Sequence, residues 1–278
     1  MVMKPINKIT FVINKRKAGA EELANTLIAK AEKRAIQTLT TKEFPLPQGI
    51  LADSQCCVVI GGDGTLLSVV EESVRHKLPV IGINLGKLGF MSTFSAQEAE
   101  AGFDTLLSGN YQIVERSIIN CVTTQKKMFF ALNDVVIKNH SSRLVRLEVF
   151  TNGESVNEYF CDGLVFSTPT GSTAYNMSAG GPIIHPAAKV LAMTPICPHT
   201  LSNRSVIFDH GEILNVKLHA DDYDVVLNID GRSSSKNKED FPLQISVSDK
   251  NFLLMLQKDY SHFKLILSKL NWTGDSIG

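Results

Sequence analysis

Hydrophobic and polar positions in the first hundred residues follow two alternating patterns. Three short runs are apolar and rich in β-branched residues, which predicts buried strands: 8–14, 56–60 and 78–84. Between them, apolar residues recur at three- and four-residue spacing, which predicts helices over 21–36 and 65–76. Strands that alternate with helices predict a Rossmann-like α/β domain with a parallel sheet over residues 1–100.

The pattern changes near residue 110 to closely spaced β-favouring runs separated by turn-forming residues. These runs lie at 112–124, 129–137, 143–151, 164–170, 205–209, 212–220, 224–230 and 242–248. Such spacing predicts an all-β sandwich over 101–257, with 233–240 as a solvated loop. Helical spacing returns at Phe263, Ile266, Leu267 and Leu270, so the tail over 258–278 is expected to pack back on the first domain.

Composition narrows the class of protein. The 278 residues, 44% hydrophobic and 20% charged, are enough for two cores, and the balance of 28 basic against 28 acidic residues gives no field for nucleic acid or an anionic membrane. The 5 cysteines form no C-x-x-C pair, which argues against a disulfide framework and a zinc site. With neither a signal-peptide pattern nor a long apolar run, the expectation is a soluble cytoplasmic protein.

The stretch Gly61–Thr65 places an aspartate among three glycines, between a predicted strand and a predicted helix. Glycines at such a junction let a phosphate approach backbone N–H groups. The alternative is an ordinary Asp-Gly turn that caps the helix. Because the carboxylate of Asp63 would repel a phosphate, its functional interpretation needs an intervening Mg²⁺ ion or a role as proton acceptor.

A second stretch, residues 161–186, is dense in hydrogen-bonding groups, which favours a ligand over a simple polar loop. Ser172, His185 and Asp162 also raise the possibility of a serine hydrolase, but the G-x-S-x-G elbow is missing. His185 and His199 lack the spacing of a helical metal pair.

Taken together, the motifs resemble those of the bacterial NAD kinase family, in the family's order across nearly the whole chain. They are GGDGT (61–65), GINLGKLGF (82–90), LNDVV (132–136), DGLVFSTPTGSTAYNMSAGGPIIHP (162–186), CPHTLSNR (197–204) and KDYSHFKLILSKLNW (258–272). The Gly-Gly-Asp-Gly motif is shared with diacylglycerol-type lipid kinases and, in variant form, with phosphofructokinases. The Thr-Pro-Thr-Gly-Ser-Thr-Ala-Tyr block is far more specific.

The resemblance implies an active site between an α/β domain and a β-sandwich, where the γ-phosphoryl group of ATP, with Mg²⁺, passes to the 2′-hydroxyl of the adenosine ribose of NAD to give NADP. It also implies a homo-oligomer, often a tetramer. Asp63 would accept the proton, and no residue is expected as a protein metal ligand. The positions expected to bind the nucleotides are Gly62, Gly64, Phe90, Asn133, Asp134, Asp162, Thr170, Thr173, Ala174, Tyr175, Asn176, Met177 and Ser178.

Within these positions the resemblance implies distinct roles. Asn133 and Asp134 would hold ribose hydroxyls, Asp162 would lie near the nicotinamide end, and residues 173–178 would cradle the dinucleotide. Phe90 would line the adenine side, and Tyr175 would lie against a base or ribose.

Several positions depart from the family pattern: Asp134 replaces a glutamate, Phe160 an arginine, Met91 a tyrosine and Arg232 a glutamine, and SARP is SNRS at 202–205. These departures concern affinity more than the reaction. Two rival functions remain: a lipid kinase, which an apolar pocket or a basic membrane-facing patch would indicate, and a non-catalytic dinucleotide-binding regulator, which would not need Asp63.

Overall fold

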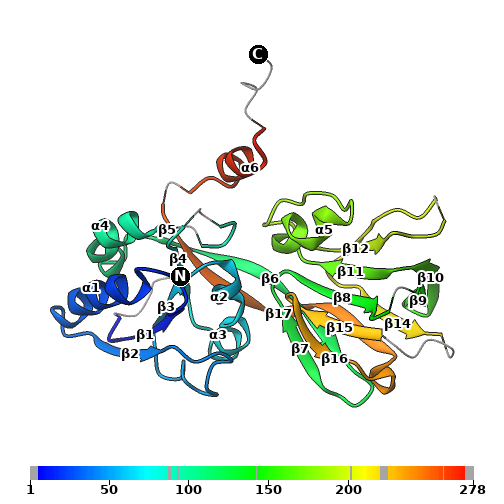
Figure 1. The fold of residues 1–278 in the computed structure, drawn as a ribbon, viewed down its shortest axis with the longest axis horizontal. Helices are drawn as coiled ribbons and strands as arrows, with labels where there is room; N and C mark the ends of the chain where they lie inside the picture. Colours follow the sequence, from blue (N-terminus) through cyan, green and yellow to red (C-terminus); the bar gives the residue numbers. More distant parts are fainter. Residues whose placement is uncertain are drawn as a thin grey trace. The chain divides into compact units, whose positions relative to one another are not determined.

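The computed structural model describes residues 6–86, 89–92, 94–141, 143–200, 202–219, 225–258 and 260–272. The chain forms two compact units, Met1–Val114 with Leu253–Gly278, and Glu115–Phe252 (Figure 1). The sequence placed the boundaries at residues 100 and 257. Residues 87, 88, 201, 220, 224, 259 and 273–278, which fall in predicted motifs or elements, lie outside the described residues.

The first unit is built on a parallel sheet. Its strands follow the order β2-β1-β3-β4, β5 pairs with β4, and the end of β17 joins β4 where Leu254 lies beside Val80. The strands are β1 (Lys8–Ile13), β2 (Gln37–Thr41), β3 (Cys56–Gly61), β4 (Val80–Asn84) and β5 (Phe94–Ser95). Strands β3 and β4 are buried along their whole length, as expected when helices cover both faces of a sheet.

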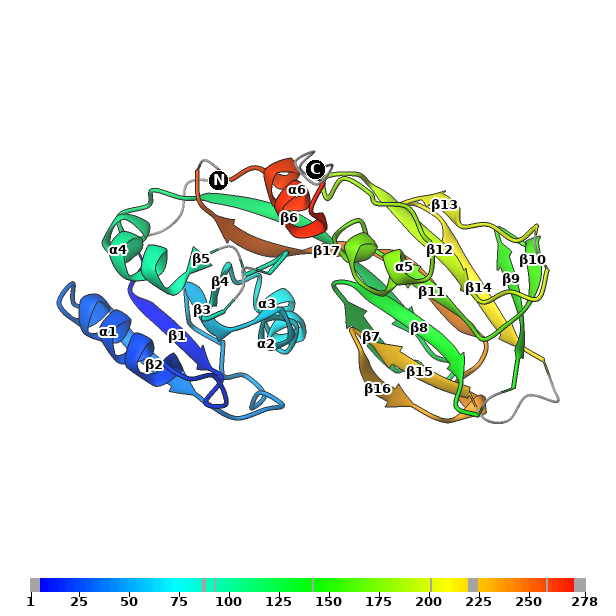
Figure 2. The same ribbon diagram turned by 45° about the horizontal axis from the view of Figure 1, so that its top comes forward.

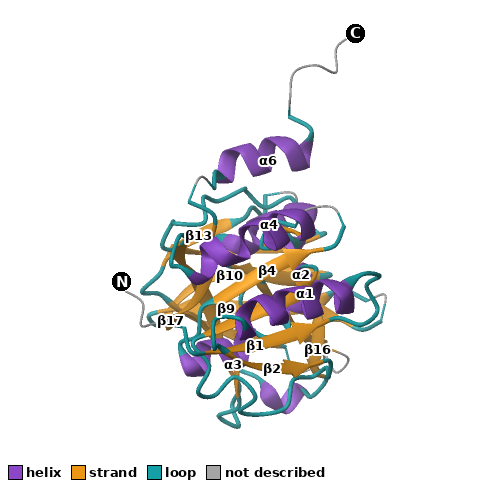
Figure 3. Cartoon of the chain, turned by 90° about the vertical axis from the view of Figure 1, so that its left-hand side faces the viewer, coloured by secondary structure: helices purple, strands orange, loops and turns teal. Residues whose placement is uncertain are grey.

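Helices α1 (Ala20–Glu32) and α4 (Ala96–Leu107) pack side by side over one face of this sheet (Figure 3). There the ring centroids of Phe11 and Phe103 lie 6.3 Å apart in the core. Helices α2 (Asp63–Leu67) and α3 (Val70–His76) lie on the other side of the strands (Figure 2). The last helix, α6 (His262–Leu270), belongs to the first unit, where Leu265 and Ile266 are buried.

The second unit is a sandwich of two antiparallel sheets. One has the order β10-β9-β14-β17, where β6 also pairs with β17 and β7 pairs with β6, and the other has the order β13-β12-β11-β8-β15-β16. The strands are β6 (Gln112–Val122), β7 (Met128–Ala131), β8 (Asp134–Asn139), β9 (Val145–Thr151), β10 (Glu154–Cys161), β11 (Gly163–Ser167), β12 (Val190–Ile196), β13 (Val206–Asp209), β14 (Ile213–Leu218), β15 (Val225–Ile229), β16 (Arg232–Ser235) and β17 (Leu243–Leu256). The short helices are η1 (Thr170–Thr173), α5 (Tyr175–Ser178) and η2 (Lys238–Asp240).

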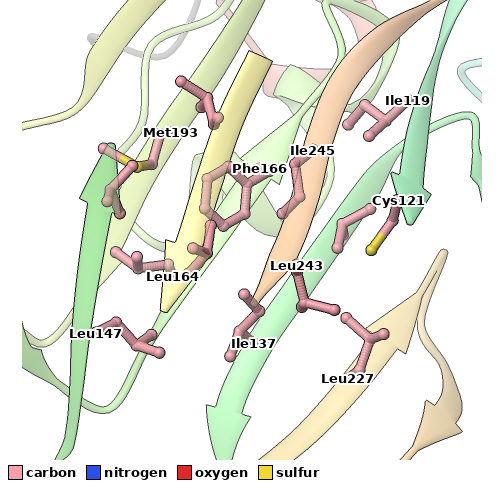
Figure 4. Close-up of a cluster of buried hydrophobic side chains, with 14 of the residues drawn as sticks. Ile119, Cys121, Ile137, Leu147, Leu164, Phe166, Met193, Leu227, Leu243 and Ile245 are labelled. Carbon is pink, nitrogen blue, oxygen red and sulfur yellow. The ribbon is translucent and has the colours of Figure 1, made fainter. Parts of the chain in front are cut away.

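The core of this sandwich takes side chains from both sheets. Figure 4 shows Phe166 of one sheet close to Ile245 of the other, and both are fully buried. Alternate residues of β9, Val145, Leu147 and Val149, point into the same core, which is the period-2 pattern expected for a strand with one buried face.

The predicted fold class, an α/β domain followed by an all-β sandwich, is confirmed. Three local predictions were wrong. The helix predicted over 65–76 is two helices, and the run 129–137 is two strands separated at Leu132 and Asn133. The predicted loop 233–240 contains β16 and η2, because this segment pairs with β15 and Ser235 hydrogen-bonds to the buried Asp240.

Among the described residues, no helix is both long enough and apolar enough to cross a membrane.

Candidate active site

The first cluster of predicted site residues lies where β3 passes into α2. A Cβ atom on Gly61 would lie only 2.3 Å from the Oγ1 atom of Thr65, so the sharp turn needs glycine there. The side-chain amide of Asn14, at the end of β1, donates to the same Oγ1 atom at 3.0 Å. The loops that follow two adjacent parallel strands are therefore tied together, at the sheet edge where α/β proteins bind ligands.

Asp63 binds the backbone of a second loop in this unit. Its carboxylate accepts hydrogen bonds from the N–H groups of Phe90 (2.8 Å), Ser92 (2.8 Å) and Met91 (3.3 Å). A Cβ atom on Gly89 would lie 2.0 Å from a carboxylate oxygen, which explains the glycine in this position. The structure thus brings Asp63 and Phe90 together, and these bonds hold the side chain of Asp63 in place.

The remaining residues of this cluster are placed around the loop. Gly62 is half-buried and Gly64 exposed. Phe90 is half-buried, and the ammonium group of Lys269 in α6 lies 6.0 Å from the centre of its ring.

The second cluster lies in the sandwich, at the start of β8. Asp230, in the turn between β15 and β16, accepts hydrogen bonds from the backbone N–H groups of Leu132 (2.9 Å), Asn133 (2.7 Å) and Asp134 (3.2 Å). Asp230 is 7% exposed and has a positive φ of 48°. Asp230 was not among the predicted site residues, because Asp-Gly before a short strand predicts a hairpin turn, which it also forms.

Asp134 itself is buried, with 4% of its surface exposed. Burial, then the negative charge of Asp230, raises the pKa of Asp134 to about 7, and a hydrogen bond from the backbone N–H of Tyr175 opposes that rise. Burial also raises the pKa of Asp230, but its three backbone bonds and the charge of Arg232 act in the other direction.

The segment 168–178, which includes the residues predicted to cradle the dinucleotide and is called the cradle below, folds against the pair Asp134 and Asp230. The hydroxyl group of Thr168 donates to the carbonyl of Leu132 at 2.6 Å and accepts from the N–H of Gly171 at 3.0 Å. A Cβ atom on Gly171 would lie 2.0 Å from the carbonyl oxygen of Asn133, so only glycine permits this approach of two backbones. With the bond from Tyr175, these contacts bring Asn133, Asp134 and the start of the cradle into one place.

The other residues of the cradle differ in how far their surface is exposed and therefore available to a ligand. Thr170, Thr173, Ala174 and Met177 are half-buried, and Tyr175 and Ser178 are exposed. The side chain of Asn176 is fully buried and bonds to Thr194 (2.7 Å) and to the carbonyl of Pro182 (3.0 Å), so it holds the loop together. Asp162 is exposed at the junction of β10 and β11.

The arrangement gives no support to a serine hydrolase. The hydroxyl group of Ser172 is buried and occupied by the carbonyl of Pro169 (2.7 Å) and the N–H of Ile184 (3.0 Å). The ring of His185 accepts from the N–H of Ala187 (3.2 Å), and the ring of His199 lies 5.7 Å from that of Phe160.

Comparison with known families matches both units. The sequence model of the ATP-NAD kinase N-terminal domain matches residues 11–111, and that of the ATP-NAD kinase C-terminal domain matches residues 132–256. The chain belongs to the NAD kinase family. The resemblance inferred from the motifs is confirmed, and with it the ATP-dependent phosphorylation of NAD to NADP.

Individual NAD kinases align over nearly their whole length. The NAD kinase of Clostridium beijerinckii is 32% identical over 272 residues, which cover 95% of this chain and 96% of that protein. The NAD kinase of Geobacter sulfurreducens is 33% identical over 255 residues, which cover 90% of this chain and 89% of that protein.

Solved structures share the fold. Yeast NADH kinase in complex with NADH superposes with a TM-score of 0.83 at 24% identity, covering 99% of this chain and 90% of the yeast chain. An NAD kinase from Archaeoglobus fulgidus in complex with ATP gives a TM-score of 0.77 at 20% identity, covering 96% of this chain and 100% of that chain.

Proposed function

We propose that this NAD kinase transfers the γ-phosphoryl group of ATP to the 2′-hydroxyl of the adenosine ribose of NAD, with Asp63 as the proton acceptor. The main support for this proposal is that the chain matches both domains of the family and also has Asp63 in its Gly-rich turn. Phosphoryl transfer needs alignment, charge neutralisation and a group that takes the hydroxyl proton. A carboxyl group held in place by a fixed loop is suited to the last of these tasks.

The fixed position of Asp63 supports this assignment. A carboxylate has about four lone-pair positions, and three N–H groups of the 90–92 segment occupy three of them. One position remains for a hydroxyl proton. Because the other bonds hold the carboxylate in place, no reorganisation is needed when the substrate hydroxyl arrives.

We propose that the sandwich binds NAD through Asn133, Asp134 and the 170–178 segment. The half-buried threonines and the exposed Tyr175 offer hydroxyl and aromatic contacts beside Asp134. The carboxyl group of Asp134 suits a ribose diol, whose hydroxyls both donate and accept hydrogen bonds. Contacts of Asp162 with the nicotinamide end and of Phe90 with adenine belong to the same proposal.

Mg²⁺ belongs to the proposal as an ion that arrives with ATP. The described residues contain no group of three or more His, Cys, Asp and Glu side chains placed to hold a metal. Mg²⁺ usually keeps several waters and binds substrate phosphates, so the triphosphate of ATP suits it. The ion would offset phosphate charge.

We further propose a cytoplasmic homo-oligomer, a tetramer by analogy with the family. Light scattering of the purified protein would test the number of subunits.

One coupled assay tests the proposed reaction. Purified protein is incubated with NAD, ATP and Mg²⁺, and NADP is detected with an NADP-specific dehydrogenase. We expect NADP to form in proportion to enzyme, and no phosphorylation when diacylglycerol replaces NAD. NAD binding without NADP formation would favour a non-catalytic regulator, and lipid phosphorylation at a comparable rate would favour a lipid kinase.

Removing the Asp134 side chain should affect NAD more than ATP. In Asp134→Ala, a ribose hydroxyl loses its partner and the N–H of Tyr175 is left unpaired. We expect the KM for NAD to rise about tenfold or more, since an unpaired buried polar group costs about 1–3 kcal/mol, while the KM for ATP changes less than threefold or so. Steady-state kinetics with each substrate varied in turn measure both constants. An equal rise in both would place Asp134 in the shared phosphate region instead.

A further inference from the structure

Two buried carboxyl groups lie beside each other at the predicted ribose site, and their surroundings differ. Asp230 accepts three backbone N–H bonds, from Leu132, Asn133 and Asp134, whereas within the part of the chain that the structure describes the carboxyl group of Asp134 accepts one, from Tyr175. Two adjacent buried carboxyls cannot both ionise cheaply, so the pair keeps one proton to a higher pH than an exposed carboxyl would. The group with more N–H donors keeps the negative charge, and the proton resides on Asp134.

We propose that Asp230 is a positioning residue that keeps Asp134 protonated and that the protonated form of Asp134 binds NAD. This inference rests on the proposed function. A protonated carboxyl offers one O–H donor and one carbonyl acceptor, which matches a ribose diol, and it adds no charge that would repel the pyrophosphate of NAD. The three backbone bonds of Asp230 also fix the start of β8, from which Asp134 projects.

Asp134 has a short side chain that keeps its carboxyl group close to its own backbone, and that backbone is the part that Asp230 binds. Charged groups that face the pair from the packed elements are few among the described residues. The β15–β16 hairpin contributes two charged residues, Asp230 and Arg232. The segment of η1 and α5 contributes the uncharged backbone N–H of Tyr175. Strand β11 contributes the uncharged Ser167, which lies opposite Asp134 in the sheet.

The direction of the pH effect follows from the protonation state. With a pKa of about 7, Asp134 is mostly protonated at low pH and mostly ionised at higher pH. If only the protonated form binds, the apparent Kd for NAD equals the intrinsic Kd divided by the protonated fraction. The Kd should therefore be constant well below pH 7 and rise about tenfold for each pH unit well above it.

The test is direct NAD binding by calorimetry between about pH 6 and pH 9, a range in which NAD itself has no titrating group. Three proteins are compared: wild type, Asp134→Asn and Asp230→Asn. Asparagine at 134 offers an N–H donor and a carbonyl acceptor at every pH, so the Kd of this variant should not change with pH. In Asp230→Asn the charge that helps keep Asp134 protonated is gone, so the rise in Kd should begin at lower pH.

A merely structural role for Asp230 would change the Kd by the same factor at every pH. A wild-type Kd that is constant or falls with rising pH overturns the inference, as does a rise of Kd in Asp134→Asn like that of wild type. If Asp230→Asn does not fold, the other two proteins decide the outcome. Absence of NAD binding at every pH contradicts the proposed function and this inference with it, whereas pH-independent binding with normal NADP formation contradicts the inference alone.

Discussion

Replacing Asp63 by asparagine should lower kcat by about a hundredfold or more while the Kd for NAD stays within a few-fold of wild type. The side-chain amide cannot take the hydroxyl proton, and general-base catalysis typically contributes about 10²–10⁴-fold. The proposed NAD contacts in the sandwich are unchanged by this substitution. The rate of NADP formation and NAD binding by calorimetry measure the two effects separately.

The same substitution also changes a structural contact, which has to be measured beside it. The amide nitrogen of the new side chain would face at least one of the N–H groups that now donate to the carboxylate of Asp63, so some loss of thermal stability is expected. Asp53→Asn is the matched control, because Asp53 is exposed, has a positive φ of 64° that asparagine tolerates, and lies outside the predicted site. A folded Asp63→Asn protein with a near wild-type kcat would make Asp63 a turn residue only.

Replacing Gly171 by alanine should damage the NAD site without removing any polar group. The added Cβ atom would lie 2.0 Å from the carbonyl oxygen of Asn133, so one backbone must move. Such overpacking costs about 1–3 kcal/mol, which is roughly 2–4 °C in Tm for each kcal/mol in a domain of this size. Because the shifted segment carries Tyr175 and faces Asp134, kcat/KM for NAD should fall about ten- to a hundredfold.

The control for this substitution is Gly102→Ala in α4. No atom lies within 4 Å of a Cβ atom built on Gly102, and alanine favours a helix over glycine by about 0.5–1 kcal/mol. This variant should keep its activity and its Tm should hold or rise slightly. Equal Tm and kcat/KM in Gly171→Ala and wild type would contradict the close approach of residues 133 and 171.

The fold class could be predicted from the sequence because its strongest signals are local. Strands β3 and β4 are continuous apolar runs, and Leu23, Leu27 and Ala31 of α1 recur on one face. The start of α4 carries a local signal as well. The hydroxyl group of Ser95 accepts a hydrogen bond from the backbone N–H of Glu98, and the carboxylate of Glu98 accepts one from the backbone N–H of Ser95. Half-buried strands such as β10, with the irregular pairing between Ser155 and Asn157, give weaker periodicity and were missed.

The candidate site could be predicted only in part. Asp63 and Asp134 stand in recognisable motifs, but their partners come from far along the chain: Asp63 binds the backbone of 90–92, and Asp134 lies beside Asp230. Such pairings depend on sheet order, which residue spacing does not specify. The role of Asn176 was also hidden, because a polar side chain in a glycine-rich loop gives no sign of whether it faces a ligand or, as here, is buried against Thr194.

The most direct test of the central claim uses NAD that lacks the 2′-hydroxyl of its adenosine ribose. A positioned carboxylate serves only the oxygen within hydrogen-bond reach, so transfer should be confined to that hydroxyl. Phosphorus NMR of the reaction with NAD should show one new phosphate, on the adenosine 2′-oxygen, and the 2′-deoxy analogue should inhibit competitively and stay unphosphorylated. Transfer of phosphate to the analogue at a rate comparable with NAD would contradict the account.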